Sequence, residues 1–267
     1  MQQTIFGILN ITPDSFSDGG RFMEPAAALA HARKLVGDGA DVLDLGAASS
    51  NPESEGVEPD IEIGRLAPVV AAMKEEGAAL SIDTFSLPVQ RWALAQGADY
   101  LNDIQGFADC EIYPELAASN AKLVVMHSVQ GRGRATRVEV SPNEIYDRVL
   151  RFFEGRIAAL VQAGIARERL ILDPGMGFFL GGNAETSFEM LRRLPGLKSA
   201  FGLPVLVSVS RKSFLRKITG RGASESGPAT VAAELFAALK GADHIRTHDP
   251  AATRDALAVW AALDKSR

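Results

Sequence analysis

The sequence predicts an α/β protein that forms a single (β/α)8, or TIM, barrel over residues 1–267. The chain has 267 residues, close to the ~250 that one such barrel needs. Eight short runs rich in Val, Ile and Leu recur along it, as expected of parallel strands that are covered on both faces. A turn and a stretch with helical spacing of apolar residues follow these runs, and this alternation indicates a parallel barrel.

The strands are expected in the eight apolar runs. They comprise residues 4–9, 42–46, 79–83, 99–103, 122–127, 169–173, 204–209 and 243–247. A doubly wound sheet is the alternative fold. It usually has fewer strands and a Gly-rich phosphate turn after the first, and no GxGxxG run follows residue 9 here.

The helices are expected between the strands, where apolar positions have helical spacing. They comprise residues 25–38, 60–76, 86–96, 143–164, 186–199, 228–240 and 250–264, with a shorter one at 112–119. Ser or Asp with an adjoining Pro marks several starts, as at Ser141-Pro142 and Asp249-Pro250. Gly-Ala pairs such as Gly39-Ala40 mark several ends, because glycine readily adopts the left-handed conformation there.

Composition excludes several classes of protein. Hydrophobic residues make up 46% of the chain and charged residues 23%, so a sizeable core can form. The net charge of −5 argues against a nucleic-acid partner, although a few cations can still gather in one pocket for an anionic substrate. Cys110 is the only cysteine, which excludes an internal disulfide and a cysteine zinc site. No signal peptide or membrane span is recognisable, so a cytoplasmic protein without a membrane partner is expected.

Polar residues stand where the predicted strands end, and in a TIM barrel that is where the active site lies. Each strand end carries at least one, and together they comprise Asn10, Asp44, Asp83, Asn102, Asp103, His127, Asp173, Ser210 to Ser213, and Arg246 to His248. A single Asp at such a place is about as often a helix cap as a catalytic group. A role in stability alone does not explain Lys, Arg, His, Asp and Asn in one ring.

The predicted ring has two chemical halves. Asp83, Asn102 and Asp173 are rich in acceptors, and buried carboxylates need donors. A planar ligand with several N–H donors, such as a 2-amino-4-oxopyrimidine edge, would supply them.

The other half consists of Lys212, Arg246 and His248, which are donors and suit a phosphate. Mg²⁺ could join through the oxygen of Asn10, since this ion prefers oxygen ligands and often bridges protein and phosphates. Asp44 and Asp103 fit equally well as caps or as partners of the ligand-binding residues.

Two other kinds of catalysis have less support in the sequence. Ser, His and Asp all occur at strand ends, but the GxSxG run of an acyl hydrolase is absent. The HxH and HExxH pairs of metal hydrolases are absent too.

Several runs resemble dihydropteroate synthase in their order and separation. They are GILNITPDSFSDGG, SIDT, LNDIQGF, VVMHS, LDPGMGF, SRKSF and RTHD, and they extend from Gly7 to Asp249. The first run and SRKS are highly specific, whereas SIDT alone would be weak. The resemblance implies condensation of 6-hydroxymethyl-7,8-dihydropterin pyrophosphate with p-aminobenzoate, giving 7,8-dihydropteroate and pyrophosphate.

The resemblance also implies a role for each matching residue. The implied catalytic residues are Asp83, Lys212 and Asp173. Asp83, Asn102, Asp173 and Lys212 would bind the pterin, and Asn10, Arg246 and His248 would hold pyrophosphate and Mg²⁺. The aminobenzoate would be bound by Ser50, Phe16, Phe178, Phe179 and Ser213, of which Ser213, at a helix N-terminus, would help bind the carboxylate.

Two departures from the family pattern concern the aminobenzoate. Ser50 and Asn51 stand where most members have Thr and Arg, and residues 177–183 form a run about two residues longer than usual. Both features resemble the sulfonamide-insensitive branch of the family. We therefore hypothesise that Phe178 or Phe179 narrows the aminobenzoate pocket and disfavours the bulkier sulfonamides.

Two other functions remain open from the sequence. A pterin-dependent methyltransferase of the same fold would keep the Asp and Asn residues but would not need the SRKS and RTH runs. A non-catalytic pterin-binding protein would tolerate loss of Lys212 or Arg246, and both are present. The resemblance further implies a homodimer, with the helices at 228–240 and 250–264 offering apolar surface.

Overall fold

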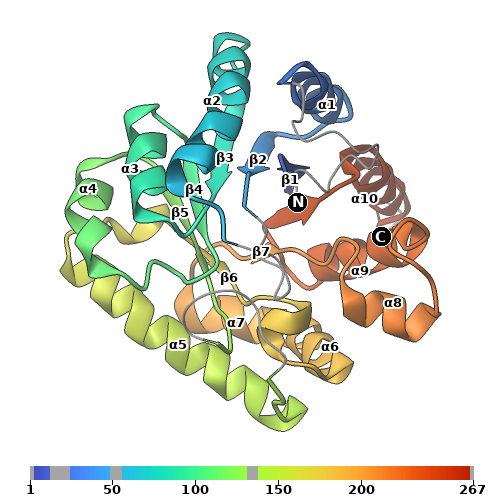
Figure 1. The fold of residues 1–267 in the computed structure, drawn as a ribbon. Coiled ribbons are helices and arrows are strands. Elements are labelled where there is room, and N and C mark those ends of the chain that lie inside the picture. Colours follow the sequence, from blue (N-terminus) through green and yellow to red (C-terminus); the bar gives the residue numbers. More distant parts are fainter. Residues whose placement is uncertain (1–2, 13–24, 49–55, 131–137, 265–267) are drawn as a thin grey trace.

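The computed structural model describes residues 3–12, 25–48, 56–130 and 138–264. Eight parallel strands and the surrounding helices form a (β/α)8 barrel, as the sequence predicts (Figure 1). The strands are β1 (Thr4–Asn10), β2 (Val42–Gly46), β3 (Ala79–Asp83), β4 (Tyr100–Asp103), β5 (Lys122–Met126), β6 (Leu170–Asp173), β7 (Leu206–Val207) and β8 (His244–Thr247).

The helices follow the strands along the chain. They are α1 (Pro25–Gly37), α2 (Pro59–Glu75), α3 (Leu87–Ala95), α4 (Tyr113–Ala118), α5 (Pro142–Gln162), α6 (Ala184–Arg192), α7 (Leu194–Phe201), α8 (Ser213–Thr219), α9 (Gly227–Leu239) and α10 (Pro250–Asp264). Three short 3₁₀ segments accompany them, namely η2 (Cys110–Ile112), η3 (Arg167–Arg169) and η4 (Gly177–Leu180). None of the described helices is long and apolar enough to cross a bilayer.

The sheet closes on itself between β6 and β7. Its strand order is β6-β5-β4-β3-β2-β1-β8-β7, so only these two strands lack a ladder partner on one side. Leu172 of β6 forms an isolated parallel bridge with Val205, and its amide donates to the carbonyl of Pro204 at 2.9 Å. This contact completes the barrel, although the expected strand at 204–209 is reduced to two residues.

The interior of the barrel is apolar at its base. Phe6, Val42, Val124, Ile171 and Leu206 form one buried cluster there. Because side chains alternate along a strand, the residues two positions further on each strand also point inward. At that next level the buried polar residues Asp44, Asp173 and Ser208 stand beside the apolar Ile8 and Met126, which places the polar site above the apolar base.

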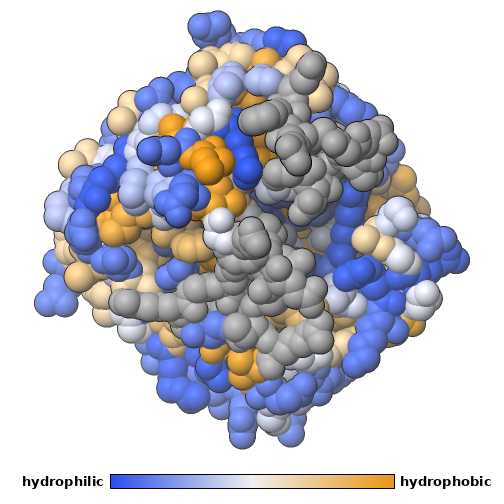
Figure 2. Space-filling view, in the orientation of Figure 1, coloured by the Kyte–Doolittle hydropathy of each residue, from blue (hydrophilic) through white to orange (hydrophobic). Residues whose placement is uncertain are grey.

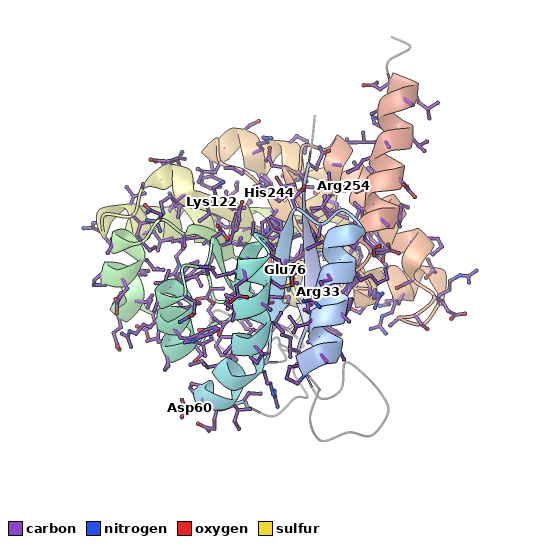
Figure 3. The ribbon with its side chains drawn as sticks, turned by 90° about the horizontal axis from the view of Figure 1, so that it is seen from above. Arg33, Asp60, Glu76, Lys122, His244 and Arg254 are labelled. Atoms are coloured by element: carbon purple, nitrogen blue, oxygen red, sulfur yellow. The ribbon has the colours of Figure 1, made fainter. Side chains whose placement is uncertain are left out.

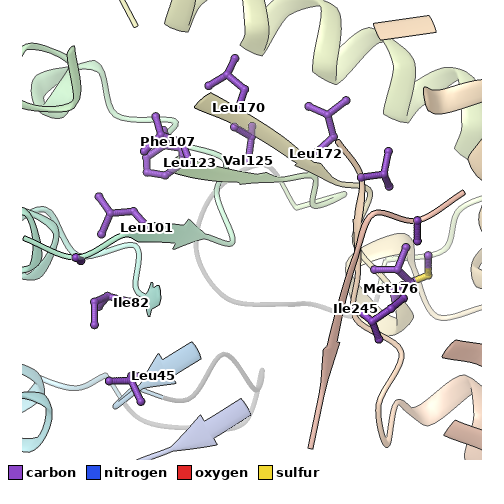
Figure 4. Packing of buried hydrophobic residues seen from close by; sticks show 14 of the residues in the cluster. Leu45, Ile82, Leu101, Phe107, Leu123, Val125, Leu170, Leu172, Met176 and Ile245 are labelled. Atoms are coloured by element: carbon purple, nitrogen blue, oxygen red, sulfur yellow. The ribbon is translucent and has the colours of Figure 1, made fainter. Parts of the chain in front are cut away.

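The main core lies between the sheet and its helices. Figure 4 shows Leu45, Ile82, Leu101, Leu123 and Val125, which alternate with the inward-facing residues and belong to the large buried cluster. Burial of apolar surface stabilises the fold by roughly 25 cal/mol per Å². On the outer surface the exposed ion pair of Arg33 on α1 with Glu76, the C-cap residue of α2, joins two neighbouring helices (Figure 3).

Two helix predictions were wrong in detail. The helix expected at 186–199 is divided at Arg193 into α6 and α7, because Pro195 has no N–H to continue the α-helical ladder. The segment at 112–119 begins as η2 and becomes α4 at Tyr113. The helical spacing of apolar residues also gave no sign of α8, which has only seven residues.

Candidate active site

The candidate site occupies the upper part of the barrel interior. Strand registers pair Asp44 with Ser81, Asp83 with Asn102, and Met126 with Asp173. Arg246 pairs with Phe6, which lies in the apolar base. These positions all share the inward parity, so the fold brings the predicted carboxylates and Arg246 together.

Arg246 is the centre of an ion-pair network. Its Nε donates to Oδ2 of Asp44 at 2.5 Å, and its Nη2 donates to Oδ2 of Asp83 at 2.6 Å. The side chain of Asp44 is fully buried and that of Asp83 is 22% exposed. Although burial acts to lower the pKa of Arg246, the carboxylates of Asp44 and then Asp83 raise it above its usual value. The guanidinium is therefore a fixed positive charge.

Asp44 is the functional residue that sequence reasoning left open between a cap and a supporting role. The structure shows it as the buried partner of Arg246. Its inward parity on β2, two residues after Val42, is the signal that distinguishes it.

Asp103 belongs instead to a structural turn. Its carboxylate accepts from Gln90 Nε2 and from the amides of Gln105 and Phe107. Burial raises its pKa to about 6, against these hydrogen bonds. It holds the chain after β4, where Phe107 adopts a positive φ of 58°, and does not face the ion-pair network.

The two carboxylates predicted to bind the pterin have pKa values raised toward neutral pH. Burial raises the pKa of Asp83 to about 7, while Arg246 opposes the rise. Burial also raises the pKa of Asp173 to about 6, and its Oδ1 accepts from the amide of Gly175 at 2.8 Å. Gly175 has a φ of 76°, and a Cβ there would lie 2.5 Å from the carbonyl oxygen of His127. Only glycine fits this turn, which fixes one carboxylate oxygen of Asp173.

Lys212 supplies a second positive charge beside these carboxylates. Burial lowers its pKa to about 8, with Arg246 acting in the same direction and Asp173 and Asp83 opposing. Its Nζ lies 5.0 Å from the centre of the Phe179 ring, a distance that permits a cation–π contact. The ammonium group is thus influenced by two carboxylates and lies over an aromatic ring.

Several buried oxygen atoms at this level have no hydrogen-bond partner among the described residues. They include Oδ1 of Asn102, Oδ1 of Asp44, Oγ of Ser81 and Oγ of Ser208. Leaving such atoms unsatisfied costs about 1–3 kcal/mol each. The arrangement therefore fits a ligand that presents N–H donors, with ordered water as the other means of satisfying these atoms.

His248 lies at the end of β8 and is held in the neutral form. Its Nδ1 is 2.9 Å from Oγ of Ser210, and its backbone amide donates to the same oxygen. Burial lowers its pKa to about 3, and the cations Arg211, Arg246 and Lys212 add to the effect. An added anion would oppose that lowering.

His127, another strand-end residue, serves the fold. Its Nδ1 lies 3.1 Å from the carbonyl oxygen of Pro174, and its ring packs edge-on against Phe152. Burial lowers its pKa to about 4. The contacts place it behind the Asp173 turn.

The predicted aminobenzoate residues are only partly described. Phe16 and Ser50 lie outside the described residues. Ser213 begins α8, and Phe178 lies in η4 with its side chain half-buried. Both line an open cavity of about 450 Å³. Phe179 is buried against Ile104 and Met126 instead, on the side of Lys212.

Asn10 ends β1 with an exposed side chain, beside Gly46 of the neighbouring strand. Within residues 3–12, 25–48, 56–130 and 138–264 no group of three or more His, Cys, Asp or Glu residues could hold a metal. Asn10 offers one oxygen ligand. That donor set fits an Mg²⁺ ion bound mainly through substrate phosphates, as this ion often is.

Comparison with known proteins identifies the family. The family model described as pterin binding enzyme matches residues 6–248. The chain is 58% identical to dihydropteroate synthase type-2 of Escherichia coli, with 98% of this chain and 96% of the relative covered. It is 55% identical to dihydropteroate synthase type-3 of the same species, with 97% of this chain and 98% of the relative covered.

A solved structure agrees. Dihydropteroate synthase of Xanthomonas albilineans with 4-aminobenzoic acid superposes with a TM-score of 0.89 at 38% identity, over 98% of this chain and 93% of that one. The same enzyme in complex with 7,8-dihydropteroate gives a TM-score of 0.86 at 37% identity, over 98% and 94%. The chain therefore belongs to the pterin-binding enzyme family and, within it, to the dihydropteroate synthases.

Proposed function

We propose that the chain condenses 6-hydroxymethyl-7,8-dihydropterin pyrophosphate with p-aminobenzoate, releasing 7,8-dihydropteroate and pyrophosphate. The observation that carries the proposal is the network of Asp44, Arg246 and Asp83 with Lys212 and Asp173 around it. This network places hydrogen-bond acceptors next to positively charged donors in one part of the barrel interior. The names of the relatives support the same reaction.

Asp83, Asn102, Asp173 and Lys212 bind the pterin in this proposal. The unpartnered Oδ1 of Asn102 accepts from an N–H of the pterin edge. Oδ2 of Asp173 remains for a second donor, since Oδ1 already accepts from Gly175. Lys212 donates to the pterin carbonyl. A ligand rich in donors favours the ionised carboxylates, so pterin binding should lower the raised pKa values of Asp83 and Asp173.

Arg246, His248 and Asn10 hold the leaving group. Arg246 uses Nε and Nη2 in its two ion pairs. Nη1 forms no hydrogen bond with the described residues and is available to a pyrophosphate oxygen. Neutral His248 carries a single ring N–H, and with Nδ1 accepting from the Ser210 hydroxyl its Nε2–H can donate to the leaving group. Mg²⁺ bound at Asn10 and the phosphates would neutralise further charge on the leaving group.

The chemical step follows from these positions. The C–O bond to pyrophosphate breaks, and the arylamine nitrogen forms a bond to the same methylene carbon and loses a proton. Asp83 lies near the pterin, where its carboxylate stabilises positive charge that develops on the ring system. Fixed charges of this kind, already oriented before the reaction, are commonly the largest contribution to rate.

Pyrophosphate release by the purified chain tests the proposal. We expect release that requires both substrates and Mg²⁺, with a product of the mass of 7,8-dihydropteroate. Pterin binding without release would instead support a non-catalytic pterin-binding protein, and a chain inactive with p-aminobenzoate would contradict the proposal.

We also propose reduced sulfonamide sensitivity, with Phe178 as the determinant. Phe178 packs against the buried cluster that contains Phe179 and also lines the cavity beside Ser213, whereas Phe179 is buried in that cluster and contacts Lys212. A side chain at the cavity wall can exclude a tetrahedral sulfonyl and its substituent without removing contacts to the planar carboxylate. Of the two aromatic residues named from the sequence, Phe178 is therefore the one whose position supports a role in excluding sulfonamides.

A homodimer is the third proposal. Among the described residues, five of the nine exposed large apolar side chains lie on two neighbouring helices, with Phe236 and Leu239 on α9 and Val259, Trp260 and Leu263 on α10. These helices lie side by side at the edge of the barrel (Figure 1). Such a patch is typical of an interface between subunits. A cytoplasmic location stays a prediction.

A further inference from the structure

The turn that follows β3 is held on both sides of Thr84, the residue directly after Asp83. The backbone amide of Thr84 donates to the carbonyl oxygen of Asn102 at 2.9 Å. Its carbonyl oxygen accepts from Nε2 of Gln90, on α3, at 3.1 Å. The peptide groups before and after Thr84 are therefore fixed from different directions, one by β4 and the other by a side chain of α3.

Gln90 also contacts the turn that follows β4. The same Nε2 donates to Oδ2 of Asp103 at 3.0 Å, and Asp103 directly follows Asn102. Because the Thr84 carbonyl and the Asp103 carboxylate both accept hydrogen bonds, the amide nitrogen of Gln90 must be the atom that faces them. One NH₂ group, with two hydrogens, thus joins the turn after Asp83 to the turn after Asn102.

The turn after β4 is itself firmly anchored. Oδ2 of Asp103 also accepts from the amide of Phe107 at 3.0 Å. The carbonyl oxygen of Phe107 accepts from the hydroxyl of Tyr113 at 2.9 Å and from Nη1 of Arg156 at 2.7 Å. This turn is therefore tied to α4 and α5, and Gln90 extends that support to the end of β3.

Stability does not explain why a glutamine occupies this position. The face of the molecule in Figure 2 is rich in hydrophilic residues, and glutamine usually lies on such a surface. Gln90 is only 1% exposed, and its Oε1 is buried with no hydrogen-bond partner among the described residues. A buried acceptor without a donor offsets much of what the two hydrogen bonds contribute. The amide therefore adds little net stability, and what it does provide is a fixed distance between two turns.

That distance matters for the pterin site. Asp83 and Asn102 are register partners on β3 and β4, and in the proposed function both contact the pterin. Asp83 is the last residue of its strand, so the turn beyond it determines where its carboxylate lies. A planar ligand requires acceptors at a fixed spacing, and misplacement by about 1 Å can lower a rate by about 10²-fold.

We propose that Gln90 is a positioning residue, which fixes the spacing of Asp83 and Asn102 for the pterin by joining the turns that follow them. The inference rests on the proposed function and adds to it a residue that does not touch the substrate. Gln90 acts through Thr84 and Asp103. A residue that served the fold alone would affect both substrates alike, and this difference provides the test.

Gln90→Met keeps the length of the side chain and removes both donors. With the full-length protein and Mg²⁺, we expect the Kd and the KM for pterin pyrophosphate to rise about tenfold, within the loss that a small misplacement causes. The KM for p-aminobenzoate and the melting temperature should change little. Titration calorimetry, steady-state kinetics and thermal unfolding measure these quantities. Gln96→Met is the matched control, because Gln96 is the exposed C-cap residue of the same helix, and it should change none of them.

Gln90→Glu provides a rescue by pH. When ionised, the introduced carboxylate can donate to neither acceptor. The charged groups around these acceptors are Asp83 of β3, Asp103 of β4, Glu62 of α2 and Arg156 of α5. Burial and the neighbouring carboxylates raise the pKa of the introduced group, and its protonated form donates again. Relative to the unsubstituted chain, the Kd for pterin pyrophosphate should be about tenfold higher at pH 8 and only about threefold higher at pH 6.

Three results would overturn the role of Gln90. They are an unchanged Kd in Gln90→Met, an equal rise of both KM values together with a lower melting temperature, or the same relative Kd of Gln90→Glu at both pH values. If Gln90→Met does not fold, the comparison of Gln90→Glu between pH 6 and pH 8 decides. A chain that binds pterin pyrophosphate but releases no pyrophosphate would refute the proposed reaction alone, because the Kd comparison does not require turnover.

Discussion

At the scale of single residues, Arg246 links the two halves of the site. One guanidinium contacts the fully buried Asp44 and the partly exposed Asp83. Removing one partner of a buried ion pair is strongly destabilising, because the remaining charge is left unpaired. Arg246 therefore holds the barrel interior together and, in the proposed function, also holds the leaving group, so substitutions there combine both effects. Lys212 offers a cleaner test.

Lys212→Ala should lower kcat/KM by about 10²–10³-fold, as loss of one fixed charge in an active site often does. The melting temperature should change little, because the buried ammonium group is already disfavoured, as its lowered pKa shows. Steady-state kinetics and thermal unfolding of the same preparation check the prediction. Lys34→Ala, which removes an exposed lysine paired with Asp38, is the control. Parallel losses of stability and activity would mean that Lys212 is mainly structural.

His248 should respond to the leaving group. Its pKa is lowered to about 3 by burial and by the surrounding cations, so it is neutral at pH 7. Bound pyrophosphate partly cancels those positive charges, and the pKa should rise. An NMR pH titration of the imidazole with and without pyrophosphate and Mg²⁺ measures the shift, and His248→Gln assigns the signal. Identical titrations would place pyrophosphate away from His248.

At the scale of secondary-structure elements, a buried carboxylic acid joins α9 to α10 behind the site. Glu234 of α9 accepts from Oγ1 of Thr253 on α10 at 2.6 Å. Burial raises its pKa to about 7, with hydrogen bonds from Thr253 and Thr247 opposing the rise. Thr247 lies between Arg246 and His248 on the chain. The protonation state of Glu234 therefore affects how α9 and α10 pack against the end of β8.

Glu234→Gln should raise stability at pH 8 and change it little at pH 4. A folded-state pKa of about 7 lies above the unfolded value of about 4.3. The folded chain thus binds more protons between these values, and the free energy of unfolding falls as pH rises through that window. Because Gln cannot ionise, the variant does not lose stability in this way as pH rises. Melting temperatures of the variant and the unsubstituted chain at pH 4 and pH 8 measure the effect, and substitution of the exposed Glu75 (Glu75→Gln) is the control. Equal shifts in melting temperature at both pH values would contradict the prediction.

The 3₁₀ segment η4 should determine inhibitor selectivity. Phe178→Ala widens the cavity wall beside Ser213, so a sulfonamide should inhibit about tenfold more strongly, within the range expected for one side-chain group in a pocket. The KM for p-aminobenzoate should change much less. Inhibition constants for one sulfonamide measure the effect, and Phe179→Leu serves as the comparison. Unchanged inhibition in Phe178→Ala would rule out the steric explanation.

At the scale of the whole molecule, the apolar patch on α9 and α10 predicts self-association. Trp260→Glu places a charge on α10, which also carries Val259 and lies against α9 with Phe236 and Leu239, and a buried unpaired charge at an interface is costly. The variant should be monomeric and still folded, whereas the unsubstituted chain should have the mass of a dimer. Light scattering after size-exclusion chromatography measures both, and Ile61→Glu on α2 is the control. A monomeric unsubstituted chain would contradict the dimer.

Local patterns carried much of the fold. The apolar runs located all eight strands to within a few residues, because strands buried on both faces need near-continuous apolar sequence. Pro and Gly located most helix ends. The division at Arg193 was missed because helical spacing continues across it, although Pro195 interrupts the hydrogen bonds.

By itself the sequence determined the barrel and which polar residues stand at its strand ends, since both follow from local periodicity and chain order. Tertiary structure alone decided how those residues divide. Asp44 pairs with Arg246 while Asp103 holds a turn, although both are aspartates on strands. Phe178 lines a cavity while Phe179 is buried against Met126, although they are adjacent. Strand alternation separates Asp44 from Asp103, which point to opposite faces of the sheet. The partner that each side chain contacts, and the depth to which neighbouring residues are buried, depend on barrel closure and on packing between distant segments.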